Sequence, residues 1–306
     1  NKSVIFISHD LDEIMEVCDT LTVLRDGKII RTFEKAEFEA GAIRASMIGR
    51  ELQGDYYRSD FQASSQPEVA LDVRNLVYED RLKGISFQVH KGEIVGIGGL
   101  AHCGMHSLGK VCFGALKPEE GSVTVEDGTI IDSPAIAMKK RVGYVSKDRD
   151  VESLCLNASI EDNISIAGMS EFAINNFLIL KNREKKYVNH QIEELSIKCA
   201  GRDQSVSQLS GGNKQKVVFG KWIGCGSEIL ILDCPTRGVD IGVKQAMYQL
   251  MVRLKNEGKS ILMISEELPE LIGMSDRILI MKNGEVSAEF ERSETLSDAQ
   301  IIEYMI

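Results

Sequence analysis

The sequence contains no hydrophobic segment long enough to cross a lipid bilayer. Its apolar runs, such as Ile229–Leu232 and Ile261–Ile264, span four residues, whereas a transmembrane helix needs about 20. No signal-peptide pattern opens the chain. We therefore expect a soluble, cytosolic protein, an expectation that leaves room for a partner in the membrane.

Positive charge is also in short supply. Lysine and arginine number 36 against 46 acidic residues, which gives a net charge of −10, and no basic arm is present. Proteins that bind nucleic acid neutralise its phosphates with a surplus of positive charge. The charge balance therefore argues against a nucleic acid as the partner.

Cysteine pairs with the spacing of metal sites are missing as well. The seven cysteines are odd in number and include no Cys-x-x-Cys pair, which favours reduced, mostly buried thiols over a disulfide framework or a zinc site. Proline is scarce, with five residues against 27 glycines. The 306 residues, 43% hydrophobic and 27% charged, suffice for one large domain or two smaller ones.

What the sequence does contain is an internal repeat. Residues 4–19 reappear in outline at 261–276, with Ser8 matching Ser265 at a separation of 257 residues. The same separation pairs Phe33 with Phe290. One fixed separation over some 30 positions is hard to attribute to chance.

The repeat divides the chain into three parts. We predict that residues 1–56 are the C-terminal remnant of one domain, that the polar stretch 57–67 is a linker, and that 68–306 are a complete second copy. Because the chain begins with Asn1, we expect it to be a fragment whose missing first copy lies upstream.

Short apolar strands alternate with helical segments in the second copy, which predicts an α/β sheet covered by helices. Strands are expected at 93–97, 229–233 and 260–264. Residues 69–87 alternate in pieces that suit antiparallel strands, and 156–200 are expected to be mostly helical, ending in an amphipathic stretch up to Cys199. The predicted fold is therefore α/β with an antiparallel β subdomain and a helical subdomain.

Two glycines stand where one of these strands meets a helix. A phosphate loop has the pattern Gly-x-x-x-x-Gly-Lys-Ser/Thr, because bare backbone lets successive N–H groups converge on a phosphate at a helix N-terminus. Gly99 and Gly104 keep that spacing, but Met105 replaces the lysine and His106 replaces the hydroxyl that would hold Mg²⁺. Taken alone, two glycines at this spacing also suit an ordinary strand-to-helix turn. If the segment is a phosphate loop, it is a degenerate one that keeps the glycine backbone and lacks the lysine and the hydroxyl.

A second glycine motif lies in Leu209-Ser210-Gly211-Gly212-Asn213. Ser210 offers a hydroxyl and the two glycines offer unobstructed N–H groups at a helix start, so the motif predicts a second anion site. It is followed by an apolar strand that ends in Asp233 and by the segment Pro235-Thr236-Arg237-Gly238-Val239-Asp240.

Together these motifs resemble the ATP-binding cassette (ABC) family, in particular the tandem-cassette ATPase subunits of ribose-, galactose- or xylose-type sugar importers. The resemblance covers essentially the whole chain and implies a P-loop NTPase-type cassette. It implies ATP and Mg²⁺ as cofactors, transmembrane permease subunits and an external sugar-binding protein as partners, and a peripheral place on the cytoplasmic face of the membrane. An importer of nucleosides or signalling molecules, and a regulatory pseudo-ATPase without transport, stay open as alternatives.

The resemblance also gives roles to single residues. It implies that the signature Leu209–Asn213 closes over the γ-phosphate of ATP held by another cassette. The Walker B aspartate, which could support Mg²⁺, is Asp233, and Cys234 follows it. The D-loop residue is Asp240, and Lys147 occupies the glutamine-loop position. Glu266 occupies the switch-histidine position, and His9 is the histidine retained in the first copy.

Several of these positions carry the wrong chemistry for hydrolysis. Cys234 stands where a glutamate would activate water, and Glu266 stands where a histidine would contact the γ-phosphate. Losing a general base costs about 10²–10⁴ in rate. We expect no hydrolysis at the second cassette's own phosphate loop, where nucleotide binds weakly or not at all. Tyr78 is a candidate for stacking on adenine there. We expect the parent subunit to be an ATP hydrolase.

Overall fold

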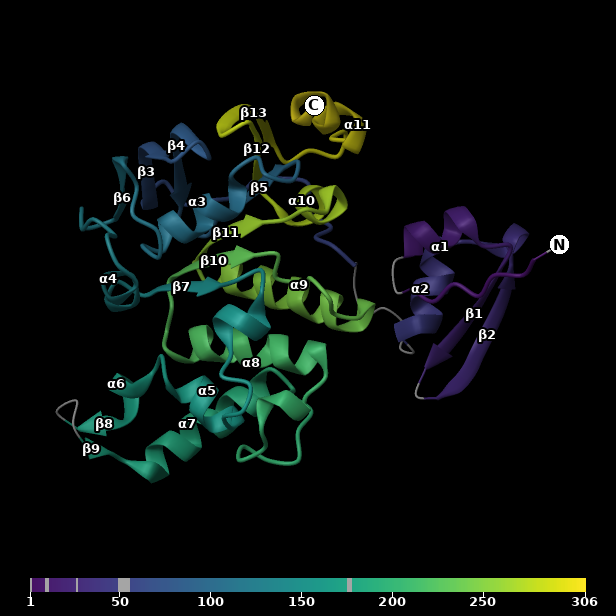
Figure 1. Cartoon of the computed structure of the whole chain (residues 1–306), viewed down its shortest axis with the longest axis horizontal. Coiled ribbons are helices and arrows are strands. Elements are labelled where there is room, and N and C mark those ends of the chain that lie inside the picture. Colours follow the sequence, from purple (N-terminus) through teal and green to yellow (C-terminus); the bar gives the residue numbers. More distant parts are fainter. Residues whose placement is uncertain (1, 9–10, 26, 49–55, 175–177) are drawn as a thin grey trace.

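A computed structural model describes residues 2–8, 11–25, 27–48, 56–174 and 178–306. Its centre is a six-stranded sheet in the order β13-β12-β5-β11-β10-β7 (Figure 1). Neighbouring strands are parallel except for β12 and β13, which pair antiparallel. The strands are β5 (Ile94–Gly99), β7 (Val142–Val145), β10 (Ile229–Asp233), β11 (Ser260–Ile264), β12 (Arg277–Lys282) and β13 (Glu285–Glu291).

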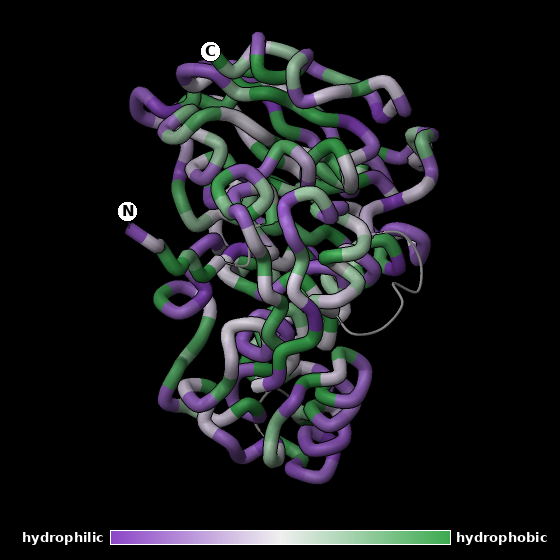
Figure 2. Tube along the Cα trace, turned by 90° about the vertical axis from the view of Figure 1, so that its right-hand side faces the viewer, coloured by the Kyte–Doolittle hydropathy of each residue, from purple (hydrophilic) through white to green (hydrophobic). Residues whose placement is uncertain are grey.

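Four strands of this sheet are buried along their whole length. β5, β7, β10 and β11 are buried at every residue rather than in an alternating pattern, because helices cover both faces of a parallel sheet. Figure 2 shows hydrophobic residues running through the middle of the molecule. β10 pairs with β11 in register up to Asp233 and Ile264, which brings the chain that follows each strand to the same edge.

Five helices belong to this α/β core. α3 contacts β5, β10 and β11, α9 contacts β11, and α10 contacts β5. Gly98 in β5 makes room for α10, since a Cβ there would lie 2.5 Å from Leu271 Cδ1. In the described part of the chain, none of the helices has the length and apolar character needed to span a membrane. The five helices are α3 (Met105–Cys112), α4 (Pro134–Lys139), α9 (Ile241–Asn256), α10 (Leu268–Met274) and α11 (Asp298–Met305).

A separate antiparallel sheet in the order β4-β3-β6 forms the β subdomain. Its strands are β3 (Val69–Tyr78), β4 (Leu82–His90) and β6 (Glu120–Val125). Buried and more exposed residues alternate along β4, as expected for a sheet with one covered face. The antiparallel strands predicted from residues 69–87 are thus confirmed.

The helical subdomain departs in part from its prediction. Within 156–200, a short hairpin interrupts the helices, and the amphipathic helix ends at Glu194 rather than at Cys199. The helix stops there because Ser196 has a positive φ of 50°, which a continuing α-helix does not allow. The elements are the π-helical turn η2 (Arg149–Ser153), α5 (Ile160–Ser165), α6 (Met169–Phe172), β8 (Ala173–Ile174), β9 (Leu178–Ile179), α7 (Lys181–Glu194), the 3₁₀ turn η3 (Val206–Gln208) and α8 (Gly211–Gly224).

The N-terminal residues build a small unit of their own beside the main body, where α2 contacts α9 (Figure 1). Residues 4–7 form no strand. The elements are α1 (Leu11–Val17), β1 (Thr20–Arg25), β2 (Lys28–Glu34), the 3₁₀ turn η1 (Lys35–Glu37) and α2 (Ala40–Ile48). Their core consists of Leu11, Ile14, Leu21, Val23, Phe33 and Ile43.

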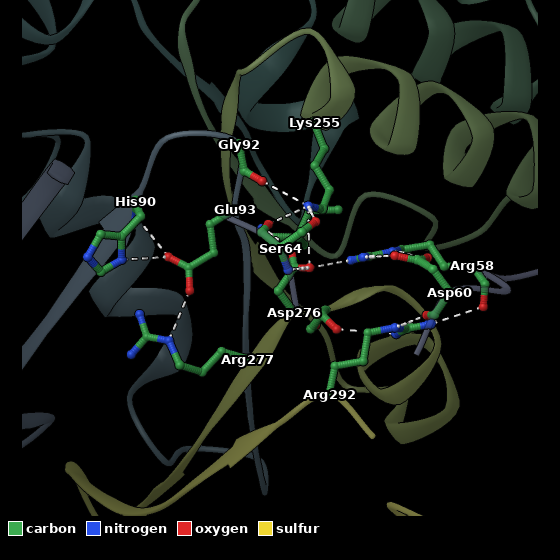
Figure 3. Close-up of polar contacts among 12 residues, drawn as sticks. Arg58, Asp60, Ser64, His90, Gly92, Glu93, Lys255, Asp276, Arg277 and Arg292 are labelled. Carbon is green, nitrogen blue, oxygen red and sulfur yellow. Dashed lines mark hydrogen bonds and ion pairs between the residues drawn. The ribbon is translucent and has the colours of Figure 1, made fainter. Parts of the chain in front are cut away.

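The segment predicted to be a linker is tied to the second copy by buried charges. Arg58 Nη1 lies 2.9 Å from Asp276 Oδ1, and both side chains are buried. Lys255 Nζ in α9 lies 3.4 Å from the same carboxylate oxygen and donates to Ser64 Oγ over 2.8 Å. Arg292 Nη2 donates to the backbone oxygen of Arg58 over 2.9 Å. Figure 3 shows these side chains converging, so the described part of the linker is packed onto the second copy.

Candidate functional site

The loop between β5 and α3 has the backbone of an anion cradle. Gly104 has a φ of +104°, and a Cβ there would lie 2.1 Å from the backbone oxygen of Arg81, so only glycine fits. α3 begins at Met105, directly after this glycine, and the first N–H groups of a helix have no partner within the helix. The loop therefore presents N–H groups at a helix N-terminus, where an anion is favoured.

Met105 adds no charge to this cradle. Its side chain belongs to the main hydrophobic core, and the residue is 1% exposed. A phosphate at the loop would meet backbone N–H groups without the ammonium that normally balances its charge. Met105 therefore offers the loop no side-chain charge.

Asp233, at the end of β10, has both carboxylate oxygens engaged by protein groups. His106 Nδ1 lies 2.7 Å from Asp233 Oδ1, and the Tyr144 hydroxyl donates to Oδ2 over 3.2 Å. Burial, together with the nearby Asp233 carboxylate, raises the pKa of Tyr144, so its hydroxyl remains a proton donor. Mg²⁺ prefers oxygen ligands and several waters, and a histidine that holds the carboxylate does not fit that ion.

Two further side chains extend this arrangement. Lys147 Nζ donates to Glu266 Oε1 over 2.6 Å and lies 3.0 Å from His106 Nε2. The hydrogen bond from Lys147 lowers the pKa of Glu266, so this carboxyl is ionised at neutral pH. We call His106, Lys147, Asp233 and Glu266 the inner polar network. Its members hydrogen-bond to one another, although the family resemblance implies that their four positions contact nucleotide, Mg²⁺ or water.

Cys234 follows Asp233 and is buried in a left-handed backbone conformation, with a φ of +49°. Its N–H donates to Ile264 O over 2.8 Å, which joins the ends of β10 and β11. Burial above all, and then the neighbouring carboxylate of Asp233, raises the pKa of the Cys234 thiol. The thiol is therefore protonated at neutral pH and makes a poor general base. All seven cysteines of the chain are free thiols.

The signature motif forms the N-terminus of α8, with Ser210 as its N-cap. Asn213 Nδ2 donates to Ser210 Oγ over 2.9 Å, and a Cβ at Gly212 would lie 2.7 Å from Val243 Cγ2 in α9. Leu209 is buried beneath the motif. A hydroxyl and glycine N–H groups at the positive end of a 14-residue helix make a favourable anion site.

Arg149 lies between the signature and residues 235–240, which we call the D-loop segment. Arg149 donates through Nη1 to Arg237 O over 2.6 Å and through Nη2 to Gly238 O over 3.3 Å. A Cβ at Gly211 would lie 3.0 Å from the same Nη2, so Arg149 joins the signature to the D-loop segment. Asp240 Oδ1 accepts from Val243 N over 3.0 Å and caps α9.

The structure brings some predicted residues together and separates others. His106, Lys147, Asp233 and Glu266 meet in the inner polar network, whereas α8 lies in a different part of the fold, below β7 in the view of Figure 1. His9 lies outside the described residues. The sequence reasoning missed Tyr144, whose only advance signal was its place in an apolar strand before Lys147.

Tyr78, the candidate for stacking on adenine, stays a prediction. It ends β3 at the turn to β4 and is half-buried. The backbone oxygen of Arg81 in the same turn approaches Gly104 of the loop.

Curated relatives match nearly the whole chain. The ribose import ATP-binding protein RbsA of Clostridium tetani is 38% identical over 304 residues, which are 99% of this chain and 59% of that protein. The RbsA of Bacillus subtilis is 38% identical over 297 residues, 97% of this chain and 59% of the relative. The chain thus spans about three fifths of the length of the curated relatives it matches.

Solved structures share the fold. A nucleotide-free ATP-binding cassette from an ABC transporter has a TM-score of 0.64 at 24% identity and covers 78% of this chain and 99% of its own. A dimeric cassette in a post-hydrolysis state with ADP and Pi has a TM-score of 0.63 at 20% identity and covers 72% and 98%. The predicted cassette fold is therefore confirmed. The family model described as "ABC transporter" matches residues 82–237, and the chain belongs to the ABC transporter family.

Proposed function

We propose that this chain is part of the ATPase subunit of a monosaccharide importer, and that its signature serves an ATP held by another cassette. The names of the curated relatives support the sugar class, since they are ribose import ATP-binding proteins. The dimeric state of a structural neighbour with ADP and Pi supports pairing between cassettes. A subunit of this kind would bind transmembrane permease subunits on the cytoplasmic face of the membrane and reach an external sugar-binding protein through them.

The different hydrogen bonding of the phosphate loop and of the signature supports different roles for these two sites. In the inner polar network, the side chains use their hydrogen-bonding groups on one another. Asp233 accepts from His106 and Tyr144, and Glu266 accepts from Lys147. Ser210 instead lies at the start of α8, where helix N–H groups face outward. The first site is built against hydrolysis, whereas the second presents donors that a phosphate can use.

Residues of the signature would contact the nucleotide directly, and Arg149 would hold the signature in position. ATP, with Mg²⁺ bound to the cassette that holds it, supplies a γ-phosphate and the free energy of its hydrolysis. Ser210 would donate its hydroxyl, and Gly211 and Gly212 their N–H groups, to that phosphate. Arg149 would hold the signature at a fixed distance from the D-loop segment. Closing and releasing this contact would shift the permease between its inward- and outward-facing states.

The experiment is Ser210→Ala in the full-length subunit, assembled with its permease in vesicles. Removing one donor from an anion site lowers the turnover rate by about 10²–10³, and sugar uptake should fall with it. Ser207→Ala is the matched control, because Ser207 lies three residues earlier, in η3, outside the α8 N-terminus. Normal ATP turnover and uptake in Ser210→Ala would refute the proposed role of the signature.

The silence of the phosphate loop needs a separate measurement. The chain alone should hydrolyse ATP at no more than the background rate, because it lacks a base and a lysine at the loop. Gly104→Ala should then have no turnover to remove. Mg²⁺-dependent turnover that disappears in Gly104→Ala would contradict this part of the proposal.

A further inference from the structure

Three different metal-binding atoms meet where the inner polar network borders Cys234. A ring nitrogen of His106, a carboxylate oxygen of Asp233 and Cys234 Sγ all lie within 4.8 Å of one another, and His106 Nδ1 is 2.7 Å from Asp233 Oδ1. They come from the start of α3 and from the end of β10. The donors of one tetrahedral zinc lie roughly 3–4 Å apart, because its bonds are about 2.0–2.3 Å long. Small side-chain rotations would therefore bring all three onto one ion.

We propose that His106, Asp233 and Cys234 bind a thiophilic divalent transition metal, with Zn²⁺ the best match. Nitrogen, oxygen and sulfur ligands together suit Zn²⁺, while Mg²⁺ takes oxygen ligands and leaves thiols alone. The proposal concerns a second ligand of this chain and stands independently of the role of the signature.

The groups around the three ligands are arranged as a metal site requires. Tyr144 donates to Asp233 Oδ2 over 3.2 Å and so leaves Oδ1 for the metal. Glu266 Oε1 lies 3.4 Å from His106 Nε2. A histidine that binds metal through one nitrogen commonly donates the other ring N–H to a carboxylate. Glu266 is placed to accept that N–H.

Metal binding would change how the histidine is bonded. Without metal, Nδ1–H donates to Asp233 while Nε2 accepts from Lys147. With metal, the Nδ1 lone pair is used for the ion, the ring proton sits on Nε2 and Cys234 gives its thiol proton to solvent. In that state Lys147 would lose its hydrogen bond to Nε2, which is 3.0 Å away, and would keep its hydrogen bond to Glu266 Oε1 over 2.6 Å.

The exposure of the three protein ligands to solvent indicates what the fourth ligand of the metal would be. Asp233 and Cys234 are buried, but 28% of the His106 side chain is exposed. The ion would thus be reached from solvent on the histidine side and would keep one position for water. Three protein ligands with one open position is the arrangement of an accessible zinc site rather than a closed structural one.

The test uses the full chain, freed of metal with a chelator, and measures binding of Zn²⁺ by calorimetry and of Co²⁺ by absorption. We expect one ion per chain and, with Co²⁺, both a thiolate-to-metal charge-transfer band and the intense visible bands of a tetrahedral site. Cys234→Ser should weaken Zn²⁺ binding at least about a hundredfold and abolish the charge-transfer band. Tyr144→Phe should weaken binding about 10–100-fold and keep the band.

Cys155→Ser is the matched control, because Cys155 is an exposed thiol outside the cluster, and it should bind as the parent chain does. The proposal fails if the unaltered chain binds no stoichiometric Zn²⁺, or if its Co²⁺ complex lacks the thiolate band. It also fails if Cys155→Ser removes the band and Cys234→Ser does not. The spectrum of the unaltered chain decides the matter even if a variant does not fold.

Discussion

Two segments of similar sequence, Val4–Ile7 and Ile261–Ile264, have opposite structures. In the first, Val4, Ile5 and Ile7 are 85%, 90% and 91% exposed and form no strand. The second lies in β11, and each of its four residues is 0% exposed. β11 pairs with β5 on one side and with β10 on the other. A central strand of a parallel sheet therefore needs its neighbours, since its sequence alone does not hold it in place.

The hairpin that follows each segment behaves differently. β1 pairs with β2 in the first copy as β12 pairs with β13 in the second, and both show an irregularity at the matching place, after Val23 and after Ile280. Antiparallel strands joined by a short turn find their partner within a few residues. Among the described residues, the N-terminal unit thus keeps its local hairpin, whereas residues 4–7 form no strand.

The largest difference should come from Asp276, whose match in the first copy is Asp19. Asp276 is buried and lies within 4.0 Å of the charged nitrogens of Arg58 and Lys255. Asp276→Asn should lower the free energy of unfolding by about 3–5 kcal/mol, because it takes the carboxylate away from the buried Lys255 ammonium and leaves Arg58 with Asp60 alone. Asp19 is exposed, so Asp19→Asn should change it by no more than about 0.5 kcal/mol.

Urea unfolding followed by circular dichroism measures both changes. Equal, small effects at the two positions would mean that the buried charges at the linker add nothing to the stability of the second copy. The packing of the linker seen in Figure 3 would then rest on its backbone contacts and on the Tyr57 ring, which lies 5.2 Å from the Tyr248 ring.

The strands themselves give the next largest effect. Leu262→Ala in β11 should lower the free energy of unfolding by about 2–5 kcal/mol, because it opens a cavity in a packed core. Ile5→Ala, at the matching exposed position, should stay within about 0.5 kcal/mol. Thermal or urea unfolding checks both. A loss of more than about 2 kcal/mol in Ile5→Ala would show that the first segment packs in solution.

Glu270 tests the contrast through pH. It is buried in α10 and accepts from Thr236 Oγ1 over 2.6 Å, and burial raises its pKa above the ordinary value for glutamate. The folded state then binds the proton more tightly than the unfolded state, so stability should fall as pH rises from about 4.3 through the folded pKa. The fall is about 1.4 kcal/mol for every unit that separates the two pKa values.

Glu270→Gln should remove this part of the pH dependence, as measured by urea unfolding between pH 4 and pH 8. Glu13→Gln, at the matching exposed position of the first copy, is the control and should leave the profile unchanged. A profile in Glu270→Gln identical to that of the parent chain would mean that Glu270 is not the group responsible.

The sequence predicted several features that depend on short stretches of chain, but it missed the β8–β9 hairpin and the end of α7 at Glu194. Continuous apolar runs predicted β10 and β11, and the two glycine motifs predicted turns into α3 and α8. It could not predict that Tyr144 reaches Asp233, because that contact depends on the register of β7 against β10. The bridge from Arg149 to the D-loop segment and the pair of Lys147 with Glu266 also join residues far apart in sequence.

The smallest effect belongs to Glu266, which stands opposite His9 in the repeat. Its pair with Lys147 is partly exposed, so Glu266→Gln should cost no more than about 1 kcal/mol at pH 7. Because the hydrogen bond from Lys147 lowers the pKa of Glu266, this stabilisation is present above the unfolded pKa of about 4.3 and disappears as pH falls through the lower folded value. A double-mutant cycle with Lys147→Gln, at pH 7 and at pH 3, measures the coupling. A coupling that persisted unchanged at pH 3 would mean that packing rather than charge joins the two side chains.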